Sequence, residues 1–148
     1  MKDLNQSYNE TLKIGQSHRD VFDWPDALAV LKKAQEELLE LKEAIEVKRR
    51  KDIFEETSDL VFTIVQCLRH LDIDLKNSLD FANEKFNLRF KKMNELIATD
   101  QKELGKLTLN EAESYWTKSK KATQNQLSEI LNSTLDSTLN STLNSTLE

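Results

Sequence analysis

Apolar residues recur every three or four positions through most of this chain, which is the spacing of one face of an α-helix. The pattern predicts helices over residues 24–47 and 53–71, a third that begins near Leu75, and a shorter fourth over residues 109–122. Glycine and proline, which interrupt helices, are absent between Asp26 and Leu104. The sequence therefore predicts an all-α fold of helices joined by short polar turns.

The same spacing predicts which face of each helix is buried and where the helices start. Residues 48–51 and 72–74 are the expected turns. The residues expected to point inward are Leu31, Ala34, Leu38, Leu41 and Ile45 in the first helix, Leu60, Val61, Ile64, Val65 and Leu68 in the second, and Phe86, Phe90, Met93 and Ile97 in the third. The expected N-terminal caps are Asp23, with Pro25 and Asp26 in the following turn, and two capping boxes, Asp52 with Glu55 and Thr108 with Glu111.

The last seventeen residues form a repeat that differs from the rest. From Asn132 the sequence reads NSTL, DSTL, NSTL, NSTL and then Glu148. Serine, threonine and asparagine favour turns and solvated backbone, whereas a leucine at every fourth residue also fits an amphipathic helix. We therefore divide the chain into an N-terminal segment (1–22), a helical domain (23–122) and a low-complexity tail (123–148) that we expect to be disordered or weakly ordered.

The composition limits the core that one copy can build. Of the 148 residues, 38% are hydrophobic and 32% charged, so we expect helices that share their apolar faces across an oligomer. A net charge of −5 gives no general attraction to nucleic-acid polymers. The single cysteine, Cys67, excludes an internal disulfide. Because no segment has the apolar length of a membrane span or the pattern of a secretory signal, we expect a cytoplasmic protein without membrane contacts.

Two acidic pairs carry the main chemical signal. Glu37 and Glu40 are three residues apart on the first predicted helix, and Glu56 and Asp59 repeat that spacing on the second. Each pair lies on one helix face, so antiparallel packing would bring four carboxylates together. Mg²⁺ prefers such oxygen ligands, and Mn²⁺ is the alternative ion. A solvated acidic face is the other interpretation, but carboxylates beside an apolar seam are costly unless they are paired.

Two further pairs lie in the second half of the chain. Lys85 and Arg89 are four residues apart on the third predicted helix, with Asn83 nearby, and Trp116 and Lys120 repeat the spacing on the fourth. A lysine point charge and a planar guanidinium can together hold a polyphosphate, although plain surface charge fits as well. Trp116 either docks its helix on the fold or lies against a nucleobase, with Lys120 reaching a phosphate.

Together these motifs resemble the MazG-type nucleotide pyrophosphohydrolases, an all-α NTP pyrophosphatase family. The similar segments follow the family's order between Val21 and Lys120, and they are FDWPDALAVLKKAQEELLEL, EETSDLVFTIVQCLRHL, ANEKFNLRF and YWTKSK. Ser58 stands where the family often has glycine, and the repeat tail matches nothing in it. The resemblance implies that Glu37, Glu40, Glu56 and Asp59 bind Mg²⁺, that Lys85 and Arg89 contact phosphates, and that Trp116, Lys120 and Asn83 complete the substrate site.

The resemblance further implies a four-helix-bundle-type module of antiparallel helices that is completed by dimerisation, in a homodimer or homotetramer. It also implies an activity, the Mg²⁺-dependent hydrolysis of NTPs or dNTPs to the monophosphate and pyrophosphate. Water would attack the α-phosphorus, with Glu40 and Glu37 as catalytic carboxylates and Glu40 as the candidate base. Two alternatives stay open. One is a pyrophosphatase specialised for a deoxy, modified or phosphoribosyl nucleotide. The other is a non-enzymatic helical oligomerisation module whose acids are solvated.

Overall fold

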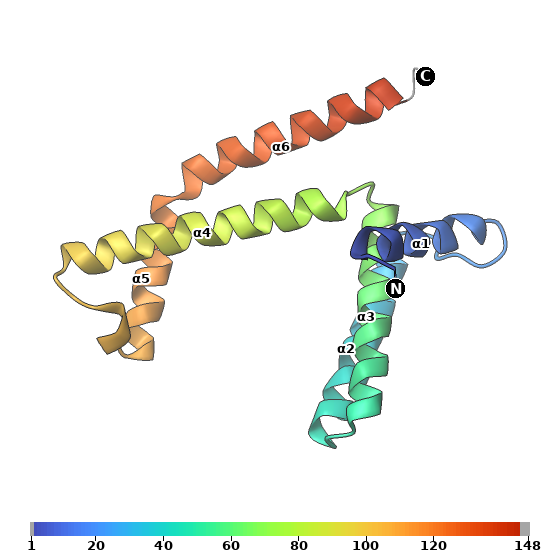
Figure 1. The fold of residues 1–148 in the computed structure, drawn as a ribbon, viewed down its shortest axis with the longest axis horizontal. Helices are drawn as coiled ribbons and strands as arrows, with labels where there is room; N and C mark the ends of the chain where they lie inside the picture. Colours follow the sequence, from blue (N-terminus) through green and yellow to red (C-terminus); the bar gives the residue numbers. More distant parts are fainter. Residues whose placement is uncertain (1, 146–148) are drawn as a thin grey trace. The chain divides into compact units, whose positions relative to one another are not determined.

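The computed structural model describes the backbone of residues 2–145 and the side chains of residues 2–136. Over this range the chain contains only helices and connecting turns, which confirms the predicted all-α fold. The chain divides into two compact units, Met1–Leu75 (unit 1) and Lys76–Glu148 (unit 2). The elements are α1 (Leu4–Ser17), α2 (Ala27–Glu46), α3 (Arg50–His70), α4 (Leu75–Thr99), the 3-10 turn η1 (Leu104–Lys106), α5 (Leu109–Ala122) and α6 (Gln124–Ser145) (Figure 1).

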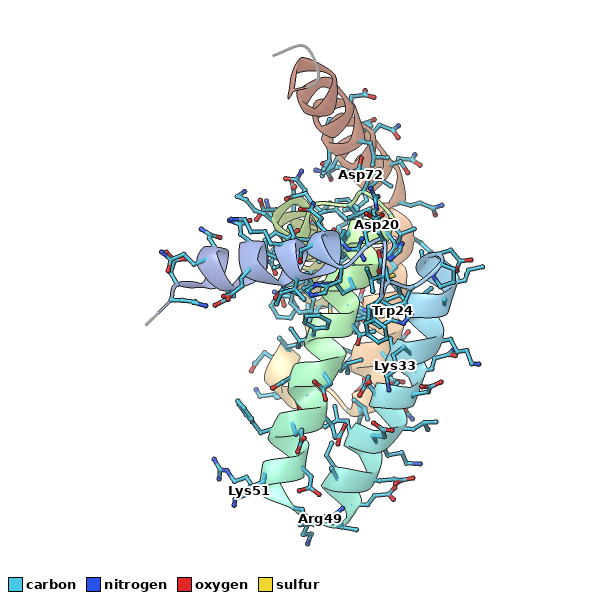
Figure 2. All side chains as sticks on the ribbon, turned by 90° about the vertical axis from the view of Figure 1, so that its right-hand side faces the viewer. Asp20, Trp24, Lys33, Arg49, Lys51 and Asp72 are labelled. Carbon is cyan, nitrogen blue, oxygen red and sulfur yellow. The ribbon has the colours of Figure 1, made fainter. Side chains whose placement is uncertain are left out.

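In unit 1, α2 and α3 lie side by side as an antiparallel hairpin, and α1 packs across α3 (Figures 1 and 2). Figure 2 shows Arg49 at the hairpin turn, where Lys48 has a positive φ of 57°. The predicted capping box at Asp52 and Glu55 is wrong, because α3 begins earlier, with Arg49 as its N-cap and no side-chain cap. Asp52 instead lies in the first turn of α3, where its carboxylate forms a salt bridge with Arg49 at 2.9 Å. Its negative charge also interacts favourably with the positive end of the helix dipole.

The N-cap of α2 is Asp26 rather than the predicted Asp23. The Asp26 carboxylate accepts a hydrogen bond from the backbone N–H of Ala29 at 2.8 Å. Asp23 is occupied elsewhere, because it accepts a 2.6 Å hydrogen bond from the Arg69 guanidinium and lies 3.2 Å from His70 Nε2. Although desolvation raises the pKa of Asp23, the bonds from Arg69 and His70 outweigh it and lower that pKa below its ordinary value.

The buried face of the hairpin differs from the predicted seam. Only Ala34 and Val65 of the predicted α2 and α3 positions are fully buried. The buried positions include small residues such as Ala34 and Ala44, whereas several larger apolar side chains stay exposed. The buried residues are Val30, Ala34, Glu37 and Ala44 on α2 and Thr63, Val65, Gln66 and Cys67 on α3, whereas Leu31, Leu38, Ile45, Val61 and Ile64 are exposed.

The contact between α1 and α3 is closest at Gly15. A Cβ at this position would overlap Gln66 Oε1 and lie 2.6 Å from Arg69 Nε. Gln66 is fully buried, and its side chain donates to the Thr11 carbonyl at 2.8 Å and accepts from Arg69 at 2.7 Å. Gln66 therefore cannot move aside without losing hydrogen bonds that a buried amide needs.

We expect Gly15→Ala to destabilise the protein by about 1–2 kcal/mol, since the steric cost exceeds the gain in helix propensity. Gly105→Ala is the matched control, because a Cβ there meets nothing within 4 Å. Urea unfolding of both variants beside the wild type measures the difference. Equal stability of the two variants would show that α1 does not pack this tightly.

In unit 2, side chains of α4 and α5 meet in a core formed by Met93, Ile97 and Tyr115. α5 has the predicted bounds, and its predicted capping box is confirmed, with Thr108 and Glu111 each accepting from the other's backbone N–H. Of the four apolar residues expected to point inward on the third predicted helix, only Met93 and Ile97 are buried. The other two, Phe86 and Phe90, are exposed and stack on each other at 5.9 Å between ring centroids.

The C-terminal segment is helical from Gln124 to Ser145, whereas its composition favoured weak order. Leu127 is buried, and the Thr123 hydroxyl just before α6 donates to the Ser119 carbonyl at 2.9 Å. A leucine at every fourth residue is compatible with this helix, although Leu131 and Leu135 are exposed. Most side chains of the repeat lie beyond the described ones, so the division into residues 1–22, 23–122 and 123–148 stays a prediction.

None of the helices within residues 2–145 combines the length and hydropathy of a membrane span.

Candidate functional site

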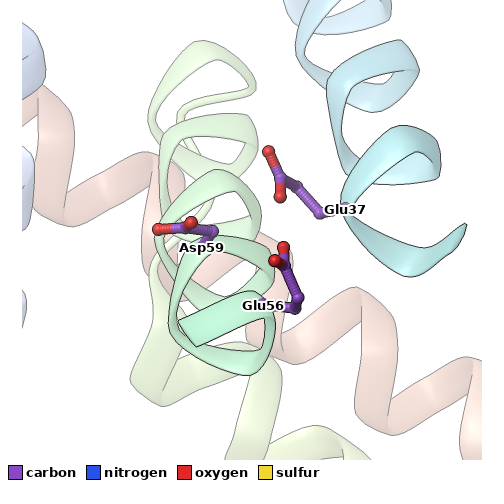
Figure 3. Close-up of side chains that lie close together, drawn as sticks. All are labelled: Glu37, Glu56 and Asp59. Carbon is purple, nitrogen blue, oxygen red and sulfur yellow. The ribbon is translucent and has the colours of Figure 1, made fainter. Parts of the chain in front are cut away.

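Three of the four acids predicted to bind a metal ion come together on the hairpin of unit 1. Glu37 projects from α2, and Glu56 and Asp59 come from α3 (Figure 3). One carboxylate oxygen of each residue lies within 4.8 Å of the others. Glu37 is only 5% exposed, Glu56 is half-buried and Asp59 is exposed. The group therefore has a sheltered side at Glu37 and an open side at Asp59.

Glu40 lies beside this group rather than in it. Its side chain is exposed, and the three-residue cluster does not include it. It is nevertheless close enough to Glu56 to share a hydrogen bond when one of the two carboxyls is protonated. Glu40 thus belongs to the same electrostatic environment, at the solvent edge of the cluster.

The carboxylates of the cluster repel one another. Desolvation raises the pKa of Glu56 above its ordinary value, and the negative charges of Glu40 and Glu37 raise it further. Among the described residues, Lys33 alone forms a salt bridge with these acids, with its Nζ 2.7 Å from Glu37 Oε1. That hydrogen bond raises the pKa of Lys33.

One lysine leaves most of the negative charge unbalanced. A hard divalent cation would balance it, and carboxylate oxygens from two helices are the donors that Mg²⁺ and Mn²⁺ prefer. The residues present therefore fit such an ion, with Glu37, Glu56 and Asp59 as its nearest ligands and Glu40 at the edge.

Three of the basic residues singled out by the sequence line one pocket of unit 2. Lys85 and Arg89 come from α4 and Lys120 from α5, and the pocket has a volume of ≈ 380 Å³. Lys121 lines it as well, and no acidic residue does. Within the described part of the chain, none of these four cations is paired with a carboxylate, and the buried Arg89 Nε has no hydrogen-bond partner. Four cations without a carboxylate partner around one pocket favour an anion as its occupant.

Trp116 and Asn83 do not line this pocket. The Trp116 ring packs against the core of unit 2, and its centroid lies 5.5 Å from that of Phe86, with the rings tilted by 45°. This contact docks α5 on α4, which is one of the two roles that the sequence left open for Trp116. Asn83 is exposed on α4. A part in substrate binding stays a prediction for both residues.

Several residues of these two sites were missed in the sequence. Lys33 precedes Glu37 by four residues, so helical spacing alone could have identified their pairing. Lys121 directly follows Lys120 in the sequence, so its proximity to the predicted site could also have been identified. Gln124 and the other pocket residues of α6 were not singled out, because the composition of the C-terminal segment favoured turns, although the leucine spacing of the repeat also fitted a helix.

A match to a protein-family model shows the family of the chain. The family model described as phosphoribosyl-ATP pyrophosphohydrolase matches residues 6–86, which is more than half of the sequence. The chain belongs to this pyrophosphohydrolase family. The matched range contains both acidic pairs as well as Lys85.

Curated relatives of this pyrophosphohydrolase-family chain confirm its resemblance to MazG-type proteins. It is 44% identical over 99 residues to the nucleoside triphosphate pyrophosphohydrolase/pyrophosphatase MazG of Thermotoga maritima, a match that covers 67% of this chain and 38% of that protein. It is 31% identical over 104 residues to the nucleoside triphosphate pyrophosphohydrolase of Escherichia coli strain K12, covering 68% and 39% respectively. The chain thus spans about two-fifths of the length of these relatives.

Replacing Glu56 by glutamine tests the electrostatics of the acidic cluster in this pyrophosphohydrolase fold. We expect Glu56→Gln to be more stable than the wild type in EDTA at neutral pH, because a charge opposed by desolvation and by Glu40 and Glu37 is removed. We also expect Mg²⁺ to raise its melting temperature less than that of the wild type. Thermal unfolding with EDTA and with Mg²⁺ measures both effects.

The matched control is Glu55→Gln, which removes an exposed charge from the same helix outside the cluster. Its response to Mg²⁺ should equal that of the wild type. A wild-type melting temperature that does not respond to Mg²⁺ or Mn²⁺ would contradict the metal site.

Proposed function

We propose that the chain hydrolyses nucleoside triphosphates, in the ribo or deoxy form, to the monophosphate and pyrophosphate with the aid of Mg²⁺ or Mn²⁺. The observation that carries the proposal is the convergence of Glu37, Glu56 and Asp59 from two helices of a pyrophosphohydrolase-family fold. The two relatives, both named nucleoside triphosphate pyrophosphohydrolases, support it.

The acids of unit 1 hold the cation. Glu37, Glu56 and Asp59 offer it carboxylate oxygens, and Lys33 holds the buried Glu37 in place. The bound ion supplies charge neutralisation at the phosphates and a lower pKa for a bound water. Glu40 is the candidate base, because it is exposed to solvent at the edge of the cluster and is itself a carboxylate that can accept a proton. Glu37 assists as the second catalytic carboxylate.

The cations of unit 2 bind the phosphates. The Arg89 guanidinium offers a planar fork, and Lys85 and Lys120 add point charges around the same pocket. These positive charges stabilise the pyrophosphate that leaves. Trp116 and Asn83 complete the substrate site, Trp116 by holding α5 so that Lys120 reaches the pocket.

The test is incubation with the eight common NTPs and dNTPs and Mg²⁺, with separate measurement of pyrophosphate and orthophosphate. We expect monophosphate and pyrophosphate in equal amounts, and no turnover in EDTA. Release of orthophosphate with formation of diphosphate would contradict cleavage at the α-phosphorus. The absence of any turnover would favour a non-enzymatic oligomerisation module.

A specialised substrate is the second candidate, because the matching family model is described as a phosphoribosyl-ATP pyrophosphohydrolase. Adding phosphoribosyl-ATP to the same panel separates the two. A kcat/KM for phosphoribosyl-ATP far above that for every NTP and dNTP would establish the specialised enzyme.

We further propose that the chain works as a homodimer or homotetramer in the cytoplasm and binds no nucleic-acid polymer. Exposed apolar residues on both hairpin helices, among them Leu38 on α2 and Val61 on α3, support the oligomer because burial by a second copy would stabilise them. Light scattering coupled to size-exclusion chromatography tests it. A monomeric mass at micromolar concentration would contradict it.

A further inference from the structure

The cationic pocket of unit 2 also has apolar lining residues. They are Phe81 of α4 and Leu127 and Leu131 of α6, and Gln124 adds a polar side chain from the first turn of α6. The Lys85 ammonium lies over the Phe81 ring, 5.4 Å from its centroid, so charged and apolar side chains adjoin. The pocket lining is therefore amphipathic, with cationic side chains beside aromatic and aliphatic ones.

These two kinds of lining side chain correspond to the two parts of a nucleotide. Phosphates require cations, whereas a base and its sugar fit apolar walls that carry a few well-placed hydrogen-bonding groups. The volume of ≈ 380 Å³ lies in the range of small-molecule sites, about 300–1,000 Å³. An inorganic phosphate alone would leave the apolar side chains without a partner.

The Gln124 side chain is suited to form hydrogen bonds with a nucleobase. Its side chain is exposed and makes no hydrogen bond among the residues that the structure describes. An amide offers both a donor and an acceptor to the edge of a base. Trp116, the other candidate for contact with a base, is instead engaged with Phe86 and the core of unit 2.

We propose that Phe81, Gln124, Leu127 and Leu131 form the nucleoside subsite of the pocket whose cations bind the phosphates. Three of these four residues belong to α6, which makes this helix a specificity-determining element. The inference rests on the proposed function, because it assumes that the anion in the pocket is a nucleotide.

Binding measured in EDTA separates the subsite from catalysis. The probes are ATP and inorganic triphosphate, which share the phosphate chain and differ in the nucleoside, and the method is isothermal titration calorimetry. Gln124→Ala and Leu131→Ala should each weaken the binding of ATP about tenfold and change the affinity for inorganic triphosphate less than about twofold. Lys85→Ala should weaken the binding of both.

Two variants on the same helix serve as controls. Asn125→Ala adjoins Gln124, and Leu135→Ala lies one turn after Leu131, and neither residue lines the pocket. Both should bind ATP as the wild type does. Leu131 is partly exposed, so its truncation does not open the core, and circular dichroism verifies that α6 stays helical.

The subsite is overturned if Gln124→Ala and Leu131→Ala leave the affinity for ATP unchanged, or if the wild type binds ATP no better than inorganic triphosphate. The pyrophosphate-release assay reports separately on the proposed function. Loss of ATP affinity in the two variants of a chain that releases no pyrophosphate would keep the subsite and refute hydrolysis. Pyrophosphate release by the wild type, with unchanged ATP affinity in the two variants, would support hydrolysis and refute the subsite.

Discussion

Replacing Asp59 by asparagine is expected to lower the kcat for pyrophosphate release at least about 100-fold, with no change in helix content. Asp59 is exposed on α3, and one of its carboxylate oxygens lies within 4.8 Å of oxygens of Glu37 and Glu56. Asparagine keeps the shape of the side chain and removes the charge that a hard cation requires. Because Asp59 lies outside the apolar core, the loss should reflect metal binding rather than folding.

The matched control for Asp59→Asn is Glu55→Gln, four residues earlier on the same helix and outside the cluster. It should keep wild-type turnover. Steady-state kinetics with saturating Mg²⁺ and far-ultraviolet circular dichroism are measured on both variants. Full activity of Asp59→Asn would refute its role as a ligand, and a loss of helix content would assign it a structural role.

Truncation of Arg89 to alanine is expected to raise KM for the triphosphate by about 10- to 100-fold. The guanidinium lines the cationic pocket of unit 2, and its buried Nε lacks a partner among the described residues. No carboxylate is released when Arg89 is removed, so folding should be little affected. Arg89→Lys should recover part of the affinity, because it restores the charge without the planar fork.

Lys91→Ala is the control for charge alone, since Lys91 lies on the same helix and does not line this pocket. KM values for ATP are measured at two salt concentrations. They distinguish a direct contact between Arg89 and the phosphates from a long-range attraction by the net positive charge, which salt screens. Equal effects of Arg89→Ala and Lys91→Ala would mean that net charge attracts the substrate and that Arg89 has no special place.

Local patterns predicted the helices better than their packing. The bounds of α5 and its Thr108–Glu111 capping box were read correctly, because both depend on residues within one turn. The buried residues of α2 were not, since apolar residues occur on more than one side of the helix and only some of them, such as Ala34, are buried. Similarly, Asp23 looked like a cap until the fold placed Arg69, which lies far along the sequence, against it.

The chemistry of the two sites was predictable to the same extent. Helical spacing placed carboxylates in pairs, and the hairpin brings Glu37 to Glu56 and Asp59 as antiparallel packing requires. The exposed place of Glu40 at the edge could not be foreseen, since it depends on how each helix is rotated. The part of the pocket that α6 lines was also not predicted, because the composition of this segment favoured turns over a helix.

The measurement that bears most directly on the central claim is a Mn²⁺ titration followed by electron paramagnetic resonance, in which the sharp lines of the free ion vanish on binding. We predict saturable binding to the wild-type chain, competition by Mg²⁺, and a large loss of affinity in Asp59→Asn and Glu56→Gln but not in Glu55→Gln. Equal Mn²⁺ affinity in the wild type and all three variants, or no binding at all, would contradict a divalent-cation site between α2 and α3.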